Sequence, residues 1–177
     1  MPDYRRFRVP GGTYFFTINL LERQSDLLVR HIDALRDAVR RTRRERPFRI
    51  DAWVVLPEHM HCVITLPQRD DDFSNRIKAI KIRFARSIPP TERRSRVRVA
   101  RGERGIWQRR FWEHAVRSDT DYARHMDYVH FNPVKHGHVA VVRDWPYSTF
   151  RRLVERGLYP SDWGGADVED VPAGEPA

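Results

Sequence analysis

The stretch His59-Met60-His61-Cys62-Val63-Ile64-Thr65-Leu66 does most to decide the fold of this chain. Every even-numbered position from 60 to 66 holds an apolar residue, the spacing expected of a strand with one buried face. That face predicts packing against helices. Because side chains alternate along a strand, His59 and His61 then project together from the opposite face of the sheet.

Patterns on both sides of this stretch predict the remaining elements. Alternating residues predict strands, and apolar residues at helical spacing predict helices. The predicted strands cover residues 13–21, 49–56, 59–66 and about 106–116. The predicted helices cover residues 31–46 and 73–88, a segment from Ser118 or Asp119 to Asn132, and about residues 148–156. We expect Pro133 to end the third helix and the arginine-rich residues 91–105 to form a mobile loop.

The order of these elements is β-α-β-β-α-β, followed by two further helices. This order is typical of the α+β class with a ferredoxin-like arrangement, in which a four-stranded antiparallel sheet carries two helices on one face. The helix after Val116 is expected to cover the other face. Residues 1–160 therefore form one domain, while residues 161–177 are an acidic, Gly- and Pro-rich tail that we expect to be disordered.

The composition excludes several classes of protein. The chain has 177 residues, a formal charge of +9, 32% charged residues and a mean hydropathy of -0.69, so it does not read as a membrane protein. Cys62 is the only cysteine, which excludes a disulfide framework and a cysteine-based zinc site. It also favours a reducing, cytoplasmic setting.

The basic charge is concentrated in two segments. Residues 83–110 hold ten arginines against two glutamates, and residues 36–49 hold seven arginines against two acids. Residues 155–177 have the opposite sign, with six acids and one arginine. Codon bias would add arginine without separating the charges in this way. Because arginine forms bidentate contacts with phosphate, the pattern favours a nucleic-acid-binding face, and the acidic tail has the right charge to compete for it.

The side chains with the clearest chemistry are the two histidines of the third strand. Two imidazoles on one strand face can share a metal ion. The motif is weak by itself, because two half-exposed histidines without a metal would give the same pattern. A phenol and an amide stand nearby in the predicted third helix: Tyr128 and Asn132 are four residues apart and so lie on one side of it. The alternative interpretation is that Tyr128 is a core residue and that Asn132 only ends the helix before Pro133.

Together these parts suit phosphodiester chemistry. A phenol with a pKa of about 10 is a poor nucleophile at neutral pH. A divalent ion held by His59, His61 and Asn132 would polarise the scissile phosphate and stabilise the charge of its transition state. Attack by Tyr128 would leave a phosphotyrosine and a free hydroxyl, so that the strand could be rejoined. Ligand chemistry alone would also allow Zn²⁺.

Five motifs resemble one known family. His59-Met60-His61 resembles the His-hydrophobic-His motif of single-tyrosine transposases, which are ferredoxin-like and act on single-stranded DNA. The stretch Tyr128-Val129-His130-Phe131-Asn132-Pro133-Val134-Lys135-His136-Gly137 is similar to the tyrosine helix of the REP-associated tyrosine transposases (RAYTs), a bacterial branch linked to repetitive extragenic palindromes. Three further motifs resemble the same branch: Gly11-Gly12-Thr13-Tyr14-Phe15-Phe16-Thr17, Trp107-Gln108-Arg109-Arg110-Phe111-Trp112-Glu113-His114 and Trp145-Pro146-Tyr147-Ser148.

The resemblance, which covers about residues 4–160, implies a Mg²⁺- or Mn²⁺-dependent nuclease and strand transferase for palindromic DNA hairpins. Tyr128 would be the nucleophile that forms a 5′-phosphotyrosine, and His59 and His61 would be metal ligands. Related transposases often place a glutamine one turn after the tyrosine as third ligand, and Asn132 stands at that position here. Such a protein would be cytoplasmic and nucleoid-associated, as a monomer or a homodimer.

DNA contacts are expected from two groups of residues. Arg5 and Arg6 lie on a polar arm suited to reading bases beside the foot of a hairpin. Six further residues could follow the phosphate backbone: Arg76, Lys78, Lys81, Arg83, Arg109 and Arg110. Trp107 or Trp112 could stack on an unpaired base, although core packing is the expected role of a tryptophan.

Two other functions compete with the transposase interpretation. The chain could be a transposase-derived module that binds structured single-stranded DNA without cutting it, and only a covalent adduct would separate the two. It could also be a small metallohydrolase that uses the histidines without Tyr128. Amidohydrolase barrels need about 250 residues, and histidine-triad hydrolases need a histidine where this chain has Val63.

Overall fold

The computed structural model describes residues 7–90, 92–166, 168 and 171–173. At its centre is a four-stranded antiparallel sheet with the strand order β2-β3-β1-β4. Its strands are β1 (Thr13–Asn19), β2 (Arg49–Val55), β3 (His59–Thr65) and β4 (Trp112–Ala115). The predicted α+β, ferredoxin-like class is confirmed.

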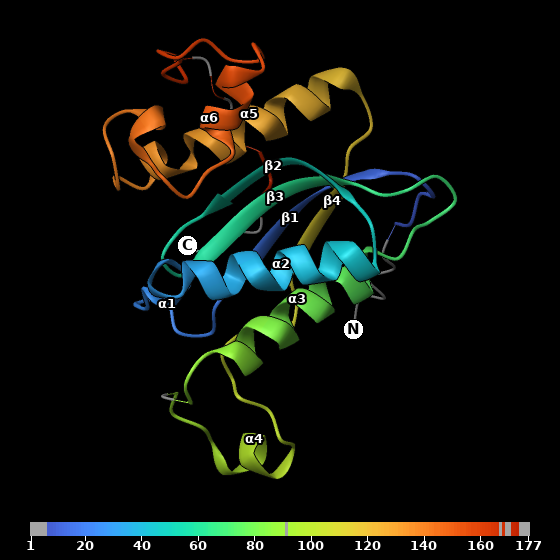
Figure 1. Cartoon of the computed structure of the whole chain (residues 1–177), viewed down its shortest axis with the longest axis vertical. Coiled ribbons are helices and arrows are strands. Elements are labelled where there is room, and N and C mark those ends of the chain that lie inside the picture. Colours follow the sequence, from blue (N-terminus) through green and yellow to red (C-terminus); the bar gives the residue numbers. More distant parts are fainter. Residues whose placement is uncertain (1–6, 91, 167, 169–170, 174–177) are drawn as a thin grey trace.

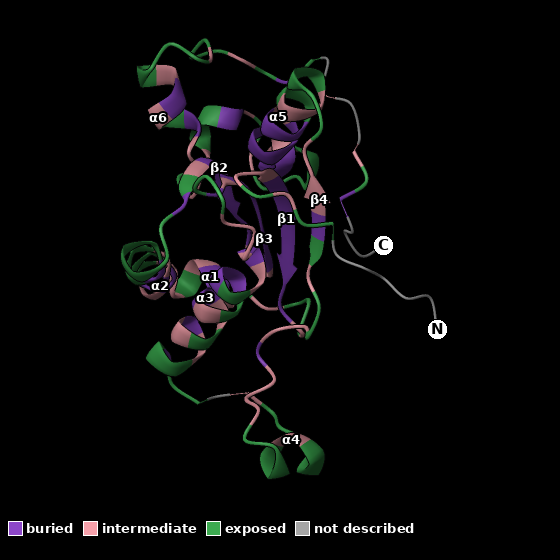
Figure 2. Cartoon of the chain, turned by 90° about the vertical axis from the view of Figure 1, so that its right-hand side faces the viewer, coloured by how far each residue is buried: buried purple, intermediate pink, exposed green. Residues whose placement is uncertain are grey.

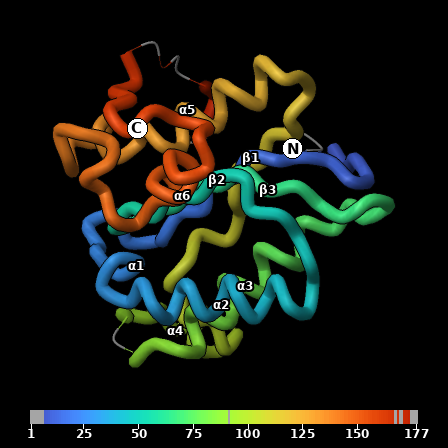
Figure 3. Tube along the Cα trace, turned by 45° about the horizontal axis from the view of Figure 1, so that its top comes forward, coloured from blue at the N-terminus to red at the C-terminus, as the bar shows by residue number. Residues whose placement is uncertain are grey.

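Helices cover both faces of this sheet (Figure 1). The long helices are α2 (Ile32–Glu45), α3 (Phe73–Ser87) and α5 (Asp119–Lys135). The short helices are α1 (Leu27–Arg30), α4 (Arg96–Ala100), the 3-10 turn η1 (Val142–Asp144) and α6 (Phe150–Glu155). Figure 3 shows α5 and the chain after it on one side of the sheet, with α2 and α3 on the other. Across the described residues, no helix is both long and apolar enough to span a bilayer.

The two faces of β3 are buried against different layers, as its alternation predicts. Met60, Cys62 and Ile64 pack in one cluster with Leu35 of α2 and Ile77 of α3. Val63 belongs to a second cluster, which includes Tyr128 and Val129 of α5. Strands β1 and β3 are buried on both sides (Figure 2). His59 and His61 therefore lie in the layer between the sheet and α5.

Helix α5 does not end at Pro133, so that prediction is wrong. A proline lacks an N–H and excludes the helical bond to the carbonyl four residues earlier, but it leaves the backbone after it free to continue. The helix runs on to Lys135. The chain then turns at Gly137, whose φ of 72° is a left-handed value that glycine adopts without strain. The extra turn is important because it carries Lys135 over the side of the helix that holds Tyr128.

The arginine-rich segment between α3 and β4 is more structured than the expected loop. Ser95 caps helix α4 by accepting a hydrogen bond from the amide of Arg98. At its base, Arg104 forms an ion pair with Glu92 and donates to the carbonyl of Ile88. Strand β4 is much shorter than predicted, because residues 106–111 contact the end of β1 only through isolated bonds such as that from the amide of Gln108 to the carbonyl of Asn19.

The described part of the acidic tail is packed against the body, contrary to the expected disorder. Trp163 lies against the rings of Phe150 and Tyr159, with centroid distances of 6.0 and 4.9 Å. Ala173 is buried in the cluster between the sheet and α5, and its carbonyl accepts a hydrogen bond from Thr17. Composition alone could not predict this packing, because it depends on where a few apolar residues contact the rest of the protein.

Candidate active site

His59 and His61 form the centre of the candidate site. Both are buried, with 4% and 0% of their surface exposed. Their rings lie 4.8 Å apart between centroids, with an interplanar angle of 81°. Adjacent imidazoles at right angles can direct one nitrogen each toward a common point.

The Nδ1 atoms of both histidines are held by neighbouring side chains. Nδ1 of His59 lies 2.8 Å from Oε1 of Glu58. Burial opposes the ionisation of Glu58, but the hydrogen bond from His59 and the nearby imidazoles keep its pKa below the usual range. The carboxylate therefore accepts the Nδ1 proton of His59. This carboxylate–histidine pairing is the arrangement that orients histidine ligands in metal sites.

Thr17 fixes His61 in the same sense. Its Oγ1 lies 2.8 Å from Nδ1 of His61 and donates its one hydrogen to the carbonyl of Ala173. Since that hydrogen is committed, Oγ1 can only accept from His61, so the Nδ1 atom of His61 carries the proton. Sequence patterns could not identify Thr17 in this role, because the partner carbonyl lies 156 residues away along the chain.

Tyr128 and Asn132 complete the buried layer above the histidines. The ring of Tyr128 lies 5.5 Å from that of His61 and 6.0 Å from that of Phe15, both in edge-on contact. Tyr128 is 1% exposed and Asn132 is 0% exposed, one helical turn apart on α5. The structure thus brings the four residues predicted from sequence into one layer: a phenol, an amide and two imidazoles.

Lys135 is a site residue that the sequence argument did not identify. Its ammonium group donates a hydrogen bond of 3.0 Å to the phenol oxygen of Tyr128 and lies 4.6 Å from the centroid of that ring. A cation at this distance can stabilise negative charge that develops on the phenol oxygen during a reaction. The expectation that Pro133 ends the helix concealed this contact. Counted seven residues along a continuous helix, Lys135 lies on the same side as Tyr128.

The donors present fit a divalent metal ion. Nε2 of His59 is buried and has no hydrogen-bond partner among the described residues, although a buried polar atom is normally satisfied. With Nδ1 protonated on both histidines, Nε2 is the coordinating nitrogen of each. Two imidazole nitrogens and an amide oxygen form a mixed set that suits several divalent ions. The structure therefore supports a metal site here without identifying the ion.

A second cluster lies nearby but is built differently. Nε2 of His114 lies 2.8 Å from Oδ2 of Asp121, and Nδ1 of His125 lies 2.8 Å from the carbonyl of Asp121 and 3.0 Å from its Oδ1. The two imidazoles are stacked, 4.6 Å apart and 16° from parallel, and their ligand atoms lie within 4.8 Å of each other and of the Asp121 carboxylate, so this group could also hold a metal ion. We interpret this cluster as a hydrogen-bonded triad that holds the start of α5 against β4.

Comparisons with known proteins identify the family of the chain, although no protein-family model matches it. A REP-associated tyrosine transposase of Escherichia coli K12 is 54% identical over 175 residues, which cover 99% of this chain and 98% of that protein. The chain belongs to the REP-associated tyrosine transposases. A Haemophilus influenzae Rd protein given the same family name is 47% identical over 166 residues, 93% of this chain and 94% of its own length.

A solved structure extends the comparison to the fold of these transposases. It is described as a REP-associated tyrosine transposase bound to a REP hairpin. The two structures match over 100% of this chain and 99% of the other. The TM-score is 0.86 at 52% sequence identity. The family resemblance seen in the sequence motifs is therefore confirmed.

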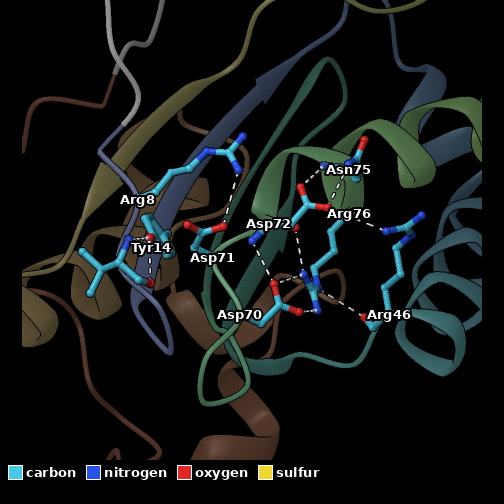
Figure 4. A network of polar contacts seen from close by, with 9 residues as sticks. Arg8, Tyr14, Arg46, Asp70, Asp71, Asp72, Asn75 and Arg76 are labelled. Carbon is cyan, nitrogen blue, oxygen red and sulfur yellow. Dashed lines mark hydrogen bonds and ion pairs between the residues drawn. The ribbon is translucent and has the colours of Figure 1, made fainter.

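Arg76 of this transposase does not lie on a DNA-facing surface, so that prediction is wrong. Its side chain is only 3% exposed. The guanidinium forms an ion pair of 2.6 Å with Asp70 and donates to the carbonyl of Asp72 (Figure 4). It also donates to the carbonyl of Pro47. The sequence pattern grouped Arg76 with its basic neighbours on α3, but its position on the helix turns it inward to fasten the loop before α3.

The other predicted DNA-binding residues of the transposase differ in their exposure to solvent. Lys78 and Arg110 are exposed, and Arg109 forms an exposed ion pair with Glu103. Lys81 donates to the carbonyl of Gln108 at 2.7 Å, and Arg83 bonds Thr42 at 2.7 Å and pairs with Glu45, so both also have structural contacts. Arg5 and Arg6 lie outside the described residues.

Several of these basic residues line one groove between α3 and the α4 segment. Lys78, Lys81 and Arg109 share it with Arg86 and Arg98.

The two tryptophans proposed for stacking differ in how exposed they are. Trp107 packs on Phe84 and donates to the carbonyl of Lys81, whereas Trp112 is 38% exposed. In the register of the sheet Trp112 is paired with Thr17, which is paired with His61, so all three lie on the face that carries the histidines.

Proposed function

We propose that this transposase is a metal-dependent endonuclease and strand transferase for single-stranded DNA that forms palindromic hairpins. The observation that supports this best is the single layer that holds a phenol, an ammonium group and two imidazoles with oriented nitrogens. The hairpin is inferred from the related structure, which is described as bound to a REP hairpin. Mg²⁺ or Mn²⁺ is the ion we propose.

In the proposed reaction the phenol oxygen of Tyr128 attacks the scissile phosphorus. The bond from phosphorus to the 3′ oxygen breaks, giving a 5′-phosphotyrosine and, after protonation, a free 3′ hydroxyl. The phosphodiester energy is retained in the tyrosine ester, so a 3′ hydroxyl can later attack it and restore the strand. Lys135 promotes the first step by stabilising negative charge on the phenol oxygen, from which it lies 3.0 Å away.

His59, His61 and Asn132 would hold the divalent ion. When bound, such an ion neutralises charge on the phosphate and orients it for in-line attack. The chain's own contribution is orientation: Glu58 and Thr17 fix the two imidazoles.

The DNA strand would cross the edge strand β4 on its way to this layer. Arg110 and Trp112 lie at that edge, and the basic groove that includes Lys78 and Arg109 lies on the α3 side of the sheet. Backbone phosphates would bind the basic groups, while an unpaired base would stack on Trp112.

Covalent capture tests this proposal. The protein is incubated with Mn²⁺ and a labelled single-stranded oligonucleotide that contains palindromes flanking its own gene, then run on a denaturing gel. We expect a labelled protein band that disappears with chelator and with Tyr128→Phe, a variant that removes one oxygen from a packed ring. Tyr122→Phe is the matched control, because Tyr122 lies on the same helix and its hydroxyl donates to Asp51 of β2.

The competing function is a module that binds hairpin DNA without cutting it. It predicts a hairpin-specific shift on a native gel with no covalent band under any metal. An adduct that persists in Tyr128→Phe would refute the proposed nucleophile.

A further inference from the structure

A cavity of about 300 Å³ lies between helix α2 and the edge strand β2. This volume is at the small end of the range for ligand pockets, about 300–1,000 Å³. Its apolar wall includes Leu35 and Val39 from α2 and Trp53 and Val55 from β2. Tyr147 closes the side where the chain before α6 pairs with β2, through the bond from the amide of Val55 to the carbonyl of Tyr147. The cavity is therefore an apolar slot with two aromatic walls.

The rim of this slot is cationic. Four of its lining residues are arginines, and none of them is an aspartate or a glutamate: the arginines are Arg36, Arg40, Arg43 and Arg152. Among the described residues, Arg36 and Arg40 form ion pairs within α2, with Asp33 and Asp37, and all four of these side chains are more than half exposed. Such exposed pairs bind weakly and are readily exchanged for a phosphate.

Arg152 is the group that most needs an anion. Its Nε is buried without a hydrogen-bond partner among the described residues. Burial, followed by the charges of Arg156 and Arg43, lowers its pKa below the ordinary value. Crowded, partly buried guanidinium groups are relieved when an anion binds among them. An apolar slot with this rim fits a ligand that has a flat apolar body and a negative charge, which is the chemistry of a nucleotide.

The slot is also connected to the candidate active site. A run of ring contacts leads from His59 through His136, His138 and Trp145 to Tyr147, with centroid distances of 5.2, 6.4, 5.2 and 5.4 Å. Successive bases of a single strand can follow stacking surfaces of this kind. A strand that leaves the histidines along this run reaches the slot within a few nucleotides.

We propose that the slot holds one unpaired nucleotide of the DNA strand that flanks the hairpin, with its base between Trp53 and Tyr147 and its phosphate on the arginine rim. This inference deepens the proposed function and rests on it for the identity of the strand. It assigns the slot a role in binding the single-stranded tail, separate from the groove between α3 and α4.

Photo-crosslinking locates the tail directly. A palindrome-derived hairpin is given a single-stranded tail on its 5′ or its 3′ side, with 5-iododeoxyuridine at successive positions, and crosslinked peptides are identified by mass spectrometry. We expect one tail to crosslink at Trp53 or Tyr147 at a single position a few nucleotides from the hairpin. Crosslinks at the α3–α4 groove alone, or none at the slot from either tail, would overturn the proposal.

Affinity measurements give a second test. Arg40→Gln combined with Arg152→Gln should weaken binding of the tailed hairpin by about 10-fold or more, while binding of the blunt hairpin stays unchanged. Arg41→Gln is the matched control, since Arg41 is an exposed arginine of the same helix outside the slot. Val39→Phe fills the slot and keeps every arginine, so it should produce the same selective loss even if the double variant folds poorly.

The outcomes separate this inference from the function on which it rests. If Tyr128 forms no adduct but the slot variants still lose the tail selectively, the slot proposal stands and the nuclease proposal fails. If the adduct forms and the slot variants bind both DNAs like the unmodified protein, the slot proposal is wrong. Equal loss of tailed and blunt hairpins would also overturn it, because that result indicates general charge attraction.

Discussion

The two faces of the central sheet differ in what they bury. The face toward α2 and α3 packs almost only aliphatic and aromatic side chains, and it includes the one cysteine, Cys62. The face toward α5 buries Thr17, the two histidines, Asn132 and Tyr128 among a smaller set of apolar residues. Burying a polar group costs free energy unless the group is hydrogen-bonded. The packing of the second face is therefore stable only if its polar side chains keep their hydrogen bonds. We infer that the first face supports the fold and the second face was given over to chemistry.

The largest expected contrast lies between two neighbouring residues on opposite faces. His61→Ala should lower the rate of adduct formation by about 10³-fold or more, because a ligand and its metal contribute several kcal/mol to the transition state. Cys62→Ala removes only one buried sulfur from the structural face, so the adduct rate per folded molecule should be unchanged. Single-turnover gels with Mn²⁺ measure both rates. If Cys62→Ala were as slow as His61→Ala, the division between the two faces would be wrong.

A second contrast lies within helix α3. Arg76→Met should lower the free energy of unfolding by about 1–3 kcal/mol, because it removes a buried guanidinium that bonds Asp70, itself 35% exposed, and the carbonyls of Asp72 and Pro47. The DNA affinity of the folded fraction should not change. Lys78→Met should have the opposite profile: stability within about 0.5 kcal/mol of the unmodified protein, and a salt dependence of hairpin binding reduced by about one charge. Urea unfolding and salt-dependent binding curves test the pair.

The third prediction concerns His130, a buried histidine of α5 that packs against Phe150 and Tyr159 rather than against His59 and His61. Burial lowers the pKa of His130 to about 4, and its Nε2 lies 2.9 Å from Oγ1 of Thr149. The unfolded chain therefore takes up this proton first as the pH falls below about 6.5. Stability from His130 is complete above that pH, is lost between about pH 6.5 and 4, and amounts to at most about 3 kcal/mol. Denaturant unfolding at several pH values measures how steeply the free energy of unfolding changes with pH.

His130→Gln is the control for this slope. The glutamine can keep a bond to Thr149 but cannot take up a proton, so its stability should fall less steeply in the same window. His125, whose pKa is also lowered by burial, and carboxyl groups such as Asp121, whose pKa is depressed by His114, change stability in the same direction. The difference between the two proteins is thus the informative quantity, and parallel curves would contradict the prediction.

The sequence predicted the features of both faces that depend on a single element, for a physical reason. Period-two alternation places a side chain on a face whatever lies across from it, so the positions of His59 and His61 followed from β3 alone. Tyr128 and Asn132 followed from helical spacing within α5. Thr17 could not be assigned in this way, because its role depends on the distant carbonyl of Ala173. Arg76 was misplaced since a basic helix face and a buried ion pair look the same in sequence.

The smallest effect concerns Lys135, which the predicted helix end had left out. Lys135→Met should slow adduct formation by about 10-fold, or about 1.4 kcal/mol, because the phenol oxygen of Tyr128 loses the cation that lies 3.0 Å away. The loss should shrink as the pH rises toward the ordinary pKa of a phenol, about 10, since the phenolate then forms without help. Lys135→Arg should recover part of the rate.

Hairpin affinity provides the control for Lys135. If the lysine acts on the phenol, Lys135→Met should bind uncleaved hairpin as well as the unmodified protein and differ only in the rate of the covalent step. If it acts instead as a phosphate contact, affinity should fall, its salt dependence should weaken, and the rate of Lys135→Met should depend on pH in the same way as that of the unmodified protein. The pH profile of the single-turnover rate therefore decides whether the last turn of α5, beyond Pro133, belongs to the chemistry of the site or only to DNA binding.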